Sequence, residues 1–292
     1  MSKVLVFGAS SLIGNYFIDT NRKYELVCFS RKIKEHFFLD LEDETALSNF
    51  KFENSFLVSF SPIWLIKKLI IKLEQCNLDT LKTLKGLIIF SSTSAITKKY
   101  SANESHKKLS KKLITSENKI LSLCKKYSIN CIIIRPTIVY GDYKKFEDGN
   151  FSRIKNFLKK MPFCILPSRT GYRQPIHFSQ LSKLANLYLN EFSTINSKEV
   201  INRLIEVGGD HELSYRDLIL KLSSSSTSFF RRKCFLIQIP NKMFYFLFSP
   251  LLIIKPKFFD ELYRIQSDLS GFPKYSDYTG EMPKSFPIDI LN

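Results

Sequence analysis

Short apolar runs alternate with longer polar stretches through the first 140 residues of the chain. Each run has the length of a buried strand, whereas the stretch from 105 to 127 carries apolar residues at helical spacing. We expect strands at the six runs, which are residues 3–7, 24–29, 36–41, 55–60, 86–91 and 129–135. Apolar strands joined by helical crossovers predict an α/β fold, in which a doubly wound parallel sheet is covered by helices on both faces.

The carboxyl ends of these strands mark the expected binding edge, because ligands of such sheets bind there. The residues that follow the strands should share that edge, and they are Gly8, Asp40, Ser59, 91–93 and 135–137.

The pattern becomes irregular after residue 145. We expect helices near 151–160 and 179–190, a final strand at 206–209, and a loop in the Ser/Thr tract at 223–228. We therefore assign residues 1–165, with 176–209 returning to them, to the sheet domain. Residues 166–175 and 210–292 are assigned to a smaller mixed C-terminal lobe on the substrate side.

The first strand runs into a turn of small residues and then into a helix. Gly8, Ser11 and Gly14 stand three residues apart, so Ser11 takes the place where dinucleotide-binding turns often have a central glycine. Gly8 allows a sharp turn off the strand, and Gly14 allows the helix to pack closely on it. Backbone N–H groups at the helix start can bind a pyrophosphate. We predict a Rossmann-type dinucleotide site whose binding residues are Gly8, Ser10, Ser11, Leu12, Ile13 and Gly14.

The second strand ends at Ser30, Arg31 and Lys32. Enzymes that prefer NAD usually place a carboxylate there, which accepts hydrogen bonds from the ribose 2′-hydroxyl. A hydroxyl and two cations suit a 2′-phosphate instead. The alternative is an ordinary basic turn in a lysine-rich protein. The sequence thus favours NADP(H) over NAD(H), with Ser30 and Arg31 as contacts.

The net charge is +17, from 44 Lys and Arg against 27 Asp and Glu. The basic residues are spread along the chain and are not interleaved with aromatic residues in any one segment, so we expect no nucleic-acid partner. The six cysteines form no Cys-x-x-Cys pair and have no histidine at ligand spacing, so we expect free thiols and no metal. Residues 1–3 lead straight into the first strand without a signal peptide, and we expect a cytoplasmic protein.

Residues 235–254 are strongly apolar, but Gln238, Pro240, Asn241, Lys242 and Pro250 interrupt them. A transmembrane helix needs a cleaner run. We expect a packed core helix or an interfacial amphipathic segment. The basic flanks at 231–233 and 255 leave peripheral membrane contact open.

Several motifs occur together in a characteristic order. They are the turn from 8 to 14, Asp40-Leu41, 90–93 (Phe-Ser-Ser-Thr), 134–141 (Ile-Arg-Pro-Thr-Ile-Val-Tyr-Gly), 173–177 (Arg-Gln-Pro-Ile-His), 207–209 (Val-Gly-Gly) and 282–286 (Met-Pro-Lys-Ser-Phe). This set resembles the extended short-chain dehydrogenase/reductase superfamily, and most closely its sugar-nucleotide epimerase, dehydratase and reductase branch. The resemblance covers most of the chain.

The resemblance implies roles for individual residues. Asp40, with Leu41, would lie by the adenine, and Thr93 would help to polarise the substrate. The segment around Pro136 would close over the nicotinamide side, and Ser59 would border the cofactor. Arg173 and His177 would border the nucleotide-sugar pocket, where Arg173 suits a diphosphate and His177 has the alternative of a buried structural role.

One expected feature is missing. The superfamily has a catalytic Tyr-x-x-x-Lys at the start of the long helix, whereas here Tyr100 is followed four residues later by Glu104. No tyrosine precedes Lys111 or Lys112 by four residues. Three interpretations stay open. Tyr100 could act as the acid with a displaced lysine, His106 or a nearby lysine could transfer the proton, or the site could bind cofactor without redox chemistry.

The resemblance therefore implies an NAD(P)-dependent reductase or epimerase that acts on a nucleotide-activated sugar, in surface-polysaccharide or lipopolysaccharide assembly. The alternative is a non-catalytic NADP(H)-binding protein, structural or redox-sensing, which the missing pair favours. A homodimer is compatible with either function.

Overall fold

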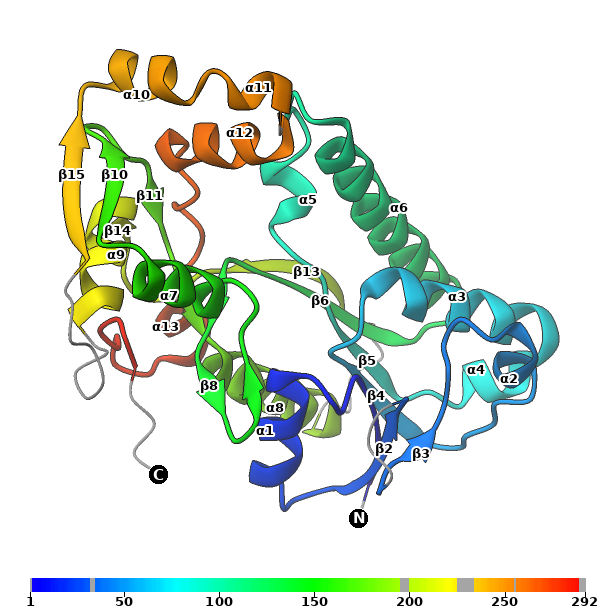
Figure 1. Ribbon diagram of the computed structural model, residues 1–292. Helices are drawn as coiled ribbons and strands as arrows, with labels where there is room; N and C mark the ends of the chain where they lie inside the picture. The colour runs from blue at the N-terminus through cyan, green and yellow to red at the C-terminus, as the bar shows by residue number, and fades with distance from the viewer. Residues whose placement is uncertain (1, 32–34, 195–199, 225–233, 255, 289–292) are drawn as a thin grey trace.

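A seven-stranded parallel sheet forms the centre of the computed structural model, which describes residues 2–31, 35–194, 200–224, 234–254 and 256–288. The strand order is β13-β6-β5-β4-β1-β2-β3 (Figure 1). The strands are β1 (Lys3–Phe7), β2 (Glu25–Ser30), β3 (Phe37–Phe38), β4 (Ser55–Ser59), β5 (Gly86–Phe90), β6 (Asn130–Pro136) and β13 (Asn202–Val207). The order reverses at β1, which lies between β4 and β2, and this is where open α/β sheets bind ligands.

Helices cover both faces of the sheet because alternate strand residues point to opposite sides. On one face, Leu57 and Ile133 belong to a core with α3 (Ile63–Cys76) and α6 (Glu104–Lys126). On the other face, Val58 and Ile132 belong to a core with α1 (Leu12–Thr20) and α8 (Phe178–Thr194). Burial from both sides explains why β4 and β5 read as unbroken apolar runs.

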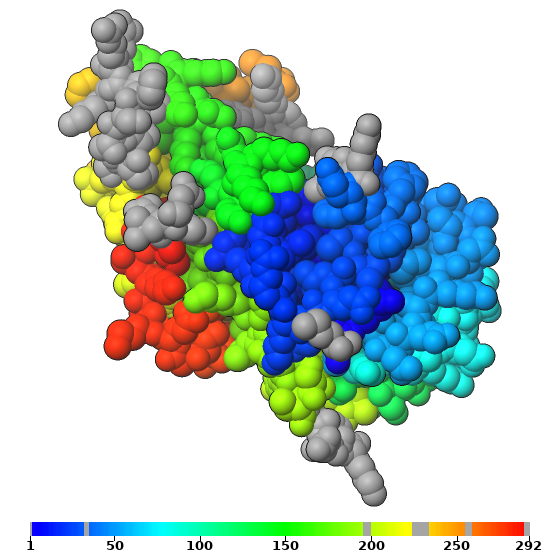
Figure 2. Space-filling model, turned by 90° about the horizontal axis from the view of Figure 1, so that it is seen from below, coloured from blue at the N-terminus to red at the C-terminus, as the bar shows by residue number. Residues whose placement is uncertain are grey.

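The space-filling view shows where the N-terminal part meets the later chain. In Figure 2 the blue N-terminal segment adjoins the green middle of the chain. Tyr16 of α1 packs edge-on against Tyr143, with ring centroids 5.0 Å apart, and Lys144 Nζ lies 2.6 Å from Asp19 Oδ2. These contacts fix the hairpin of β8 (Asp142–Tyr143) and β9 (Phe146–Glu147) beside α1.

The C-terminal region adds small two-stranded sheets around a separate apolar core. They are formed by β10 (Phe163–Pro167) with β15 (Phe235–Ile239), β11 (Tyr172–Arg173) with β14 (Leu213–Ser214), and β12 (Ile176–His177) with β7 (Val139–Tyr140). The remaining helices are α2 (Glu44–Ser48), α4 (Leu78–Lys82), α5 (Ser94–Thr97), α7 (Phe151–Lys160), α9 (Tyr215–Ser224), α10 (Asn241–Phe248), α11 (Leu251–Ile254), α12 (Pro256–Tyr263), η1 (Arg264–Gln266) and α13 (Tyr275–Thr279).

The expected α/β fold is confirmed, and three local expectations need correction. The third strand is only Phe37–Phe38, because the chain turns after it, with the Asp43 N–H donating to the Asp40 carbonyl at 3.1 Å. The final strand begins earlier than expected, at Asn202, and ends at Val207. Ser223 and Ser224 end α9 rather than forming a loop, and 225–228 lie outside the described residues.

The apolar segment 235–254 is neither one core helix nor one interfacial helix. It forms β15, α10 and α11, since Pro240 precedes α10 and Pro250 precedes α11. The basic flanks at 231–233 and 255 lie outside the described residues. Over the parts of the chain that the structure describes, no helix has the length and apolar character needed to cross a bilayer.

Candidate functional site

The glycine turn after β1 has the geometry of a phosphate cradle. Gly8 has φ +71°, and the Ser11 backbone N–H donates to the Gly8 carbonyl at 2.9 Å. Ser11 caps α1, since its Oγ accepts from the Gly14 N–H at 3.0 Å. A Cβ at Gly14 would lie 2.4 Å from the Gly8 oxygen, and one at Gly8 would lie 2.7 Å from Ser61 N. Only glycine fits either position, so the close approach expected from the sequence is present.

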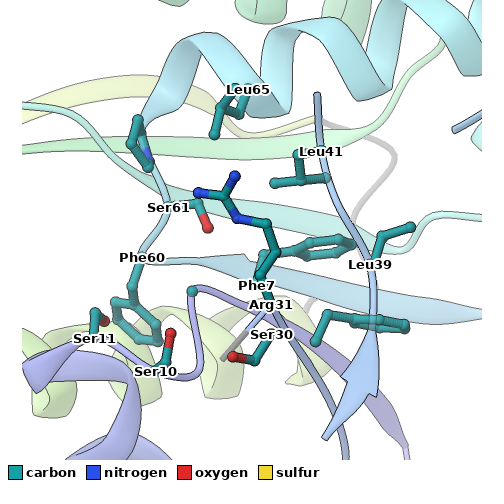
Figure 3. A pocket seen from close by; sticks show the side chains of 13 residues that line it. Phe7, Ser10, Ser11, Ser30, Arg31, Leu39, Leu41, Phe60, Ser61 and Leu65 are labelled. Carbon is teal, nitrogen blue, oxygen red and sulfur yellow. The ribbon is translucent and has the colours of Figure 1, made fainter. Parts of the chain in front are cut away.

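A cavity of about 300 Å³ opens beside this turn, at the carboxyl ends of β1, β2 and β4 (Figure 3). Its lining residues are Phe7, Gly8, Ser10, Ser11, Phe29, Ser30, Arg31, Leu39, Leu41, Phe60, Ser61, Pro62 and Leu65. The structure thus gathers six of the residues that the sequence predicts for the cofactor, which are Gly8, Ser10, Ser11, Ser30, Arg31 and Leu41. Leu12, Ile13, Gly14, Asp40, Ser59 and Pro136 are not among the lining residues.

Arg31 lies over the cavity between two carboxylates. Its Nη1 is 3.4 Å from Asp40 Oδ1 and 3.8 Å from Glu42 Oε2, and about half of its side chain is exposed. Figure 3 shows the guanidinium between Ser61 and Leu41. Asp40 also accepts from the Glu42 N–H at 3.0 Å, so the turn holds the carboxylate in place. The sequence interpretation missed Glu42, which directly follows the expected third strand.

Phe60 forms another wall that the sequence interpretation missed. It follows β4 directly, and its ring stacks on Phe90 with centroids 5.1 Å apart. The same ring lies 5.4 Å from Phe17 of α1. Figure 3 places Phe60 beside Ser10 and Ser11. Ser59 is fully buried, and its Oγ accepts from the Ser61 N–H at 3.2 Å, so it shapes the turn that carries Phe60.

Thr93 lies beyond Phe60, where β5 passes into α5. It is buried, and its hydroxyl donates to the Pro136 carbonyl at 3.1 Å. The Thr93 N–H donates to the same oxygen at 3.0 Å. The structure therefore brings two predicted residues together, because both the hydroxyl and the N–H of Thr93 donate to the carbonyl of Pro136 at the end of β6.

A buried ion-pair cluster lies at the same edge, made of Ser91, Glu117, Arg135 and Glu206. Glu117 of α6 has no exposed surface and binds Arg135 through Nε at 2.9 Å and Nη2 at 2.6 Å. Arg135 Nη1 reaches Glu206 at 2.9 Å, and Ser91 Oγ donates to Glu117 at 2.5 Å. The hydrogen bonds from Glu117 raise the pKa of Arg135. The sequence interpretation missed this cluster. The signal that could have found it is Glu117, a carboxylate four residues after Leu113 and so on the apolar side of the long helix.

The two candidate acids have different surroundings. Tyr100 lies between α5 and α6 with 86% of its surface exposed, and Lys99 Nζ lies 5.2 Å from its ring centroid. His106 is half-buried in the first turn of α6, with Nδ1 2.9 Å from Asp260 Oδ2 and 3.3 Å from Ser101 Oγ. Desolvation and the nearby Lys98 lower the pKa of His106, while Asp260 partly opposes them. His106 therefore ties α6 to α12.

Arg173 and His177 are both buried in the C-terminal region. The Arg173 guanidinium donates to the main-chain carbonyls of Tyr172, Ser267 and Arg264 at 2.8, 2.5 and 2.6 Å. Burial lowers its pKa to about 10.

His177 is 2% exposed, and its Nδ1 lies 2.7 Å from Ser179 Oγ. Burial, with a smaller effect of Lys284, lowers its pKa to about 4, so the ring is neutral at pH 7. The proposed contacts of both residues with substrate stay predictions.

Comparison with known proteins gives a consistent result at the level of structure alone. No protein-family model matches the sequence, and no curated protein matches it. Solved structures match over most of the chain. The UDP-glucose 4-epimerase of Thermotoga maritima shares 13% identity over 82% of this chain and 86% of its own, with a TM-score of 0.60. The UDP-glucuronic acid 4-epimerase of Bacillus cereus, solved with NAD, shares 18% sequence identity over 81% of this chain and 87% of its own, with a TM-score of 0.58. The protein gox2253 shares 15% sequence identity over 96% of this chain and 92% of its own, with a TM-score of 0.64.

The chain has the same fold as these two sugar-nucleotide 4-epimerases. The resemblance expected from the sequence is thus confirmed for the fold. Since the sequence identities lie between 13% and 18%, the comparisons establish the fold but not the reaction.

The geometry itself defines what this edge can bind. The Gly8–Gly14 turn presents backbone N–H groups at the start of a nine-residue helix, which suits phosphate oxygens. The adjoining cavity has apolar walls at Phe29, Leu39 and Leu41, and a hydroxyl and a guanidinium at Ser30 and Arg31. Apolar walls with few polar groups suit a nucleoside. The described residues of this edge therefore offer N–H donors for phosphate oxygens beside an apolar cavity that carries a hydroxyl and a guanidinium.

Proposed function

We propose that the chain binds a nicotinamide dinucleotide and acts as an oxidoreductase or epimerase on a nucleotide-activated sugar. The observation that supports this proposal is the glycine cradle, where a Cβ at Gly8 or Gly14 would clash, opening on a nucleoside-sized cavity at the switch point of the sheet. The fold shared with sugar-nucleotide epimerases supplies the reaction class as an analogy. The same analogy extends to assembly of surface polysaccharide or lipopolysaccharide.

The cavity residues would hold the adenosine end. Leu39 and Leu41 would pack against the base, and backbone N–H groups from Ser10 to the first turn of α1 would bind the pyrophosphate. Arg31 would bind a 2′-phosphate, so the preference is for NADP(H) over NAD(H). Asp40 and Glu42, both within 4 Å of Arg31, would oppose a phosphate and make this preference small.

The reactive end would extend past Phe60 toward Thr93. When bound, the nicotinamide supplies or accepts a hydride. Thr93 would turn its hydroxyl from the Pro136 carbonyl to a substrate carbonyl oxygen. Tyr100 or His106 would transfer the proton. Because desolvation lowers the pKa of His106, it would serve better as a base than as an acid. Arg173 and His177 would border the sugar nucleotide.

The test is calorimetric binding of NADPH, together with two assays of turnover on one panel: NADPH oxidation by UDP- and dTDP-linked keto-sugars, and interconversion of UDP-hexose epimers, which regenerates the cofactor and consumes no NADPH. Binding with turnover of any panel member supports the enzyme. On such a substrate, Tyr100→Phe or His106→Ala should slow turnover by about 10²–10⁴, the cost of losing one general acid or base. Tyr127→Phe, at the far end of α6, is the control. Full activity in both site variants would place the acid elsewhere, and absence of NADPH binding would refute the proposal.

A specific observation favours a second function, a non-catalytic dinucleotide-binding protein that is structural or redox-sensing. The buried residues of α6, a helix described throughout, are Ser110, Leu113, Ser116, Glu117, Ile120, Leu123 and Cys124, and no tyrosine or lysine is among them. Glu117 is already bonded to Ser91 and Arg135. Tight NADPH binding without turnover of any panel member would favour this second function.

A further inference from the structure

Helix α10 is apolar beyond its first turn, which carries Asn241 and Lys242, yet Phe244 is the only one of its residues that is buried. Its inward face carries Phe244, which is fully buried, and Tyr245, whose ring lies 5.6 Å from Tyr263 and 6.3 Å from Phe259 of α12. A helix that is hydrophobic all round is normally buried all round, in a core or in lipid. The outer side of α10 therefore needs a partner.

Six exposed apolar residues of α10 and α11 lie within one stretch of the chain, residues 243–254, and we call them together the α10–α11 surface. Its members and their exposures are Met243 (59%), Phe246 (83%), Leu247 (53%), Leu252 (51%), Ile253 (89%) and Ile254 (69%). Figure 1 shows both helices at the outer edge of the molecule, with α12 on their inner side. Scattered exposed apolar residues are ordinary, but a continuous apolar patch marks an interaction site.

The charge of this segment of the sequence points to its partner. Lys242, at the start of α10, is exposed. From Phe229 to Phe259 the sequence contains no Asp or Glu and six Lys and Arg, although Asp260 and Glu261 follow directly in α12. Of these basic residues the structure describes the side chain of Lys242 alone. The chain as a whole carries +17. An apolar surface in a purely basic segment matches a partner that is apolar and negatively charged, as an anionic bilayer is.

The dimensions favour docking in the plane of the bilayer. Helix α10 has eight residues and α11 has four, so α10 is about 12 Å long and neither crosses a bilayer. Short helices with aromatic and aliphatic residues on one side lie at the interface between headgroups and acyl chains. A second copy of the chain would fit less well, because a two-fold contact through this surface would bring the exposed Lys242 of one copy toward the Lys242 of the other.

We propose that the α10–α11 surface docks the protein onto an anionic lipid bilayer. This proposal is independent of the dinucleotide site, which lies at the β1–β4 edge of the sheet. It assigns a place of action to the chain, at the membrane surface, whatever reaction the site performs.

The test is flotation of the full chain with vesicles of phosphatidylcholine, with and without phosphatidylglycerol. The wild type should float with the anionic vesicles and less well at high salt. The double variant Phe246→Ser/Ile253→Ser should lower partitioning by roughly tenfold or more, since two large apolar side chains no longer enter the bilayer. Met282→Ser, which replaces an 88% exposed methionine outside this surface, is the matched control and should float as the wild type does.

Three results would overturn the proposal. They are no flotation with anionic vesicles, equal flotation of the double variant when thermal unfolding shows it to be folded, and a wild-type dimer that the double variant converts to a monomer in sedimentation velocity. If the double variant does not fold, Lys242→Glu replaces it. Unchanged flotation of Lys242→Glu would then refute the electrostatic part of the docking.

Discussion

Glu117 of α6 and Arg135 of β6 are joined by two hydrogen bonds, Nε–Oε1 at 2.9 Å and Nη2–Oε2 at 2.6 Å, and the carboxylate has no exposed surface. This pair fixes the long helix to the carboxyl edge of the sheet, beside Ser91 and close to Thr93. The charged groups of Glu117 and Arg135 at this edge are thus paired with each other.

Glu117→Gln should destabilise the protein by about 3–5 kcal/mol, the usual cost of leaving one partner of a buried ion pair unpaired. Urea unfolding at pH 7 measures the loss. Glu104→Gln, on the exposed first turn of the same helix, is the control and should unfold as the wild type does. A Glu117 variant as stable as the wild type would show that the pair contributes nothing to the fold.

Arg31→Ala should weaken NADPH binding by about 1–3 kcal/mol, because a charge-assisted hydrogen bond to the 2′-phosphate is lost, and should leave NADH nearly unchanged. Glu42→Gln should act in the opposite direction and strengthen NADPH binding, since it removes a carboxylate 3.8 Å from the Arg31 guanidinium. Calorimetric titration with both cofactors measures each effect. Equal losses for NADPH and NADH in Arg31→Ala would contradict the assignment of Arg31 to the 2′-phosphate.

Gly14→Val should abolish the rise in melting temperature that NADPH produces, because a Cβ at this position would lie 2.4 Å from the Gly8 oxygen and push α1 off the cradle. Gly149→Ala is the control, since a Cβ there meets no atom within 4 Å. Thermal unfolding with and without NADPH gives the comparison. A full shift in a folded Gly14→Val protein would mean that the phosphates bind elsewhere.

Stability should fall as the pH drops from about 6.5 to 4, with His177 as one cause. Burial lowers the pKa of His177 to about 4, so over this window the unfolded chain binds a proton that the folded protein does not. The full effect is about 3 kcal/mol, reached below pH 4 and absent above pH 7. Urea unfolding of His177→Asn should show a smaller loss over this window than the wild type. The exposed His211→Asn is the control, and identical pH profiles for His177→Asn and the wild type would exclude this cause.

The fold was predictable because its signals are local. Apolar runs such as 55–59 and 86–90 are buried on both sides and leave no ambiguity about the layer they occupy. The Gly8–Gly14 turn was predictable for a similar reason, since backbone geometry there admits no side chain.

The parts of the site that sequence could not supply depend on distant partners. Arg173 has the chemistry to bind a diphosphate, but its donors reach carbonyls of Ser267 and Arg264, more than 90 positions away in the chain. Glu42 and Phe60 belong to no motif. The folded structure alone shows that Glu42 lies beside Arg31 and that Phe60 lines the cavity, because these residues follow different strands whose ends come together. His106 likewise meets Asp260 across two helices.

Phe60 lies between the cavity and the end of β5. Its ring lines the cavity on one side and stacks on Phe90 of β5 on the other. If the cavity holds the adenosine end as proposed, a mononucleotide such as AMP would occupy it without passing that ring, whereas a dinucleotide would have to extend past the ring to reach Thr93. On that proposal, one aromatic side chain would separate recognition of the nucleotide from access to the place where a reaction would occur.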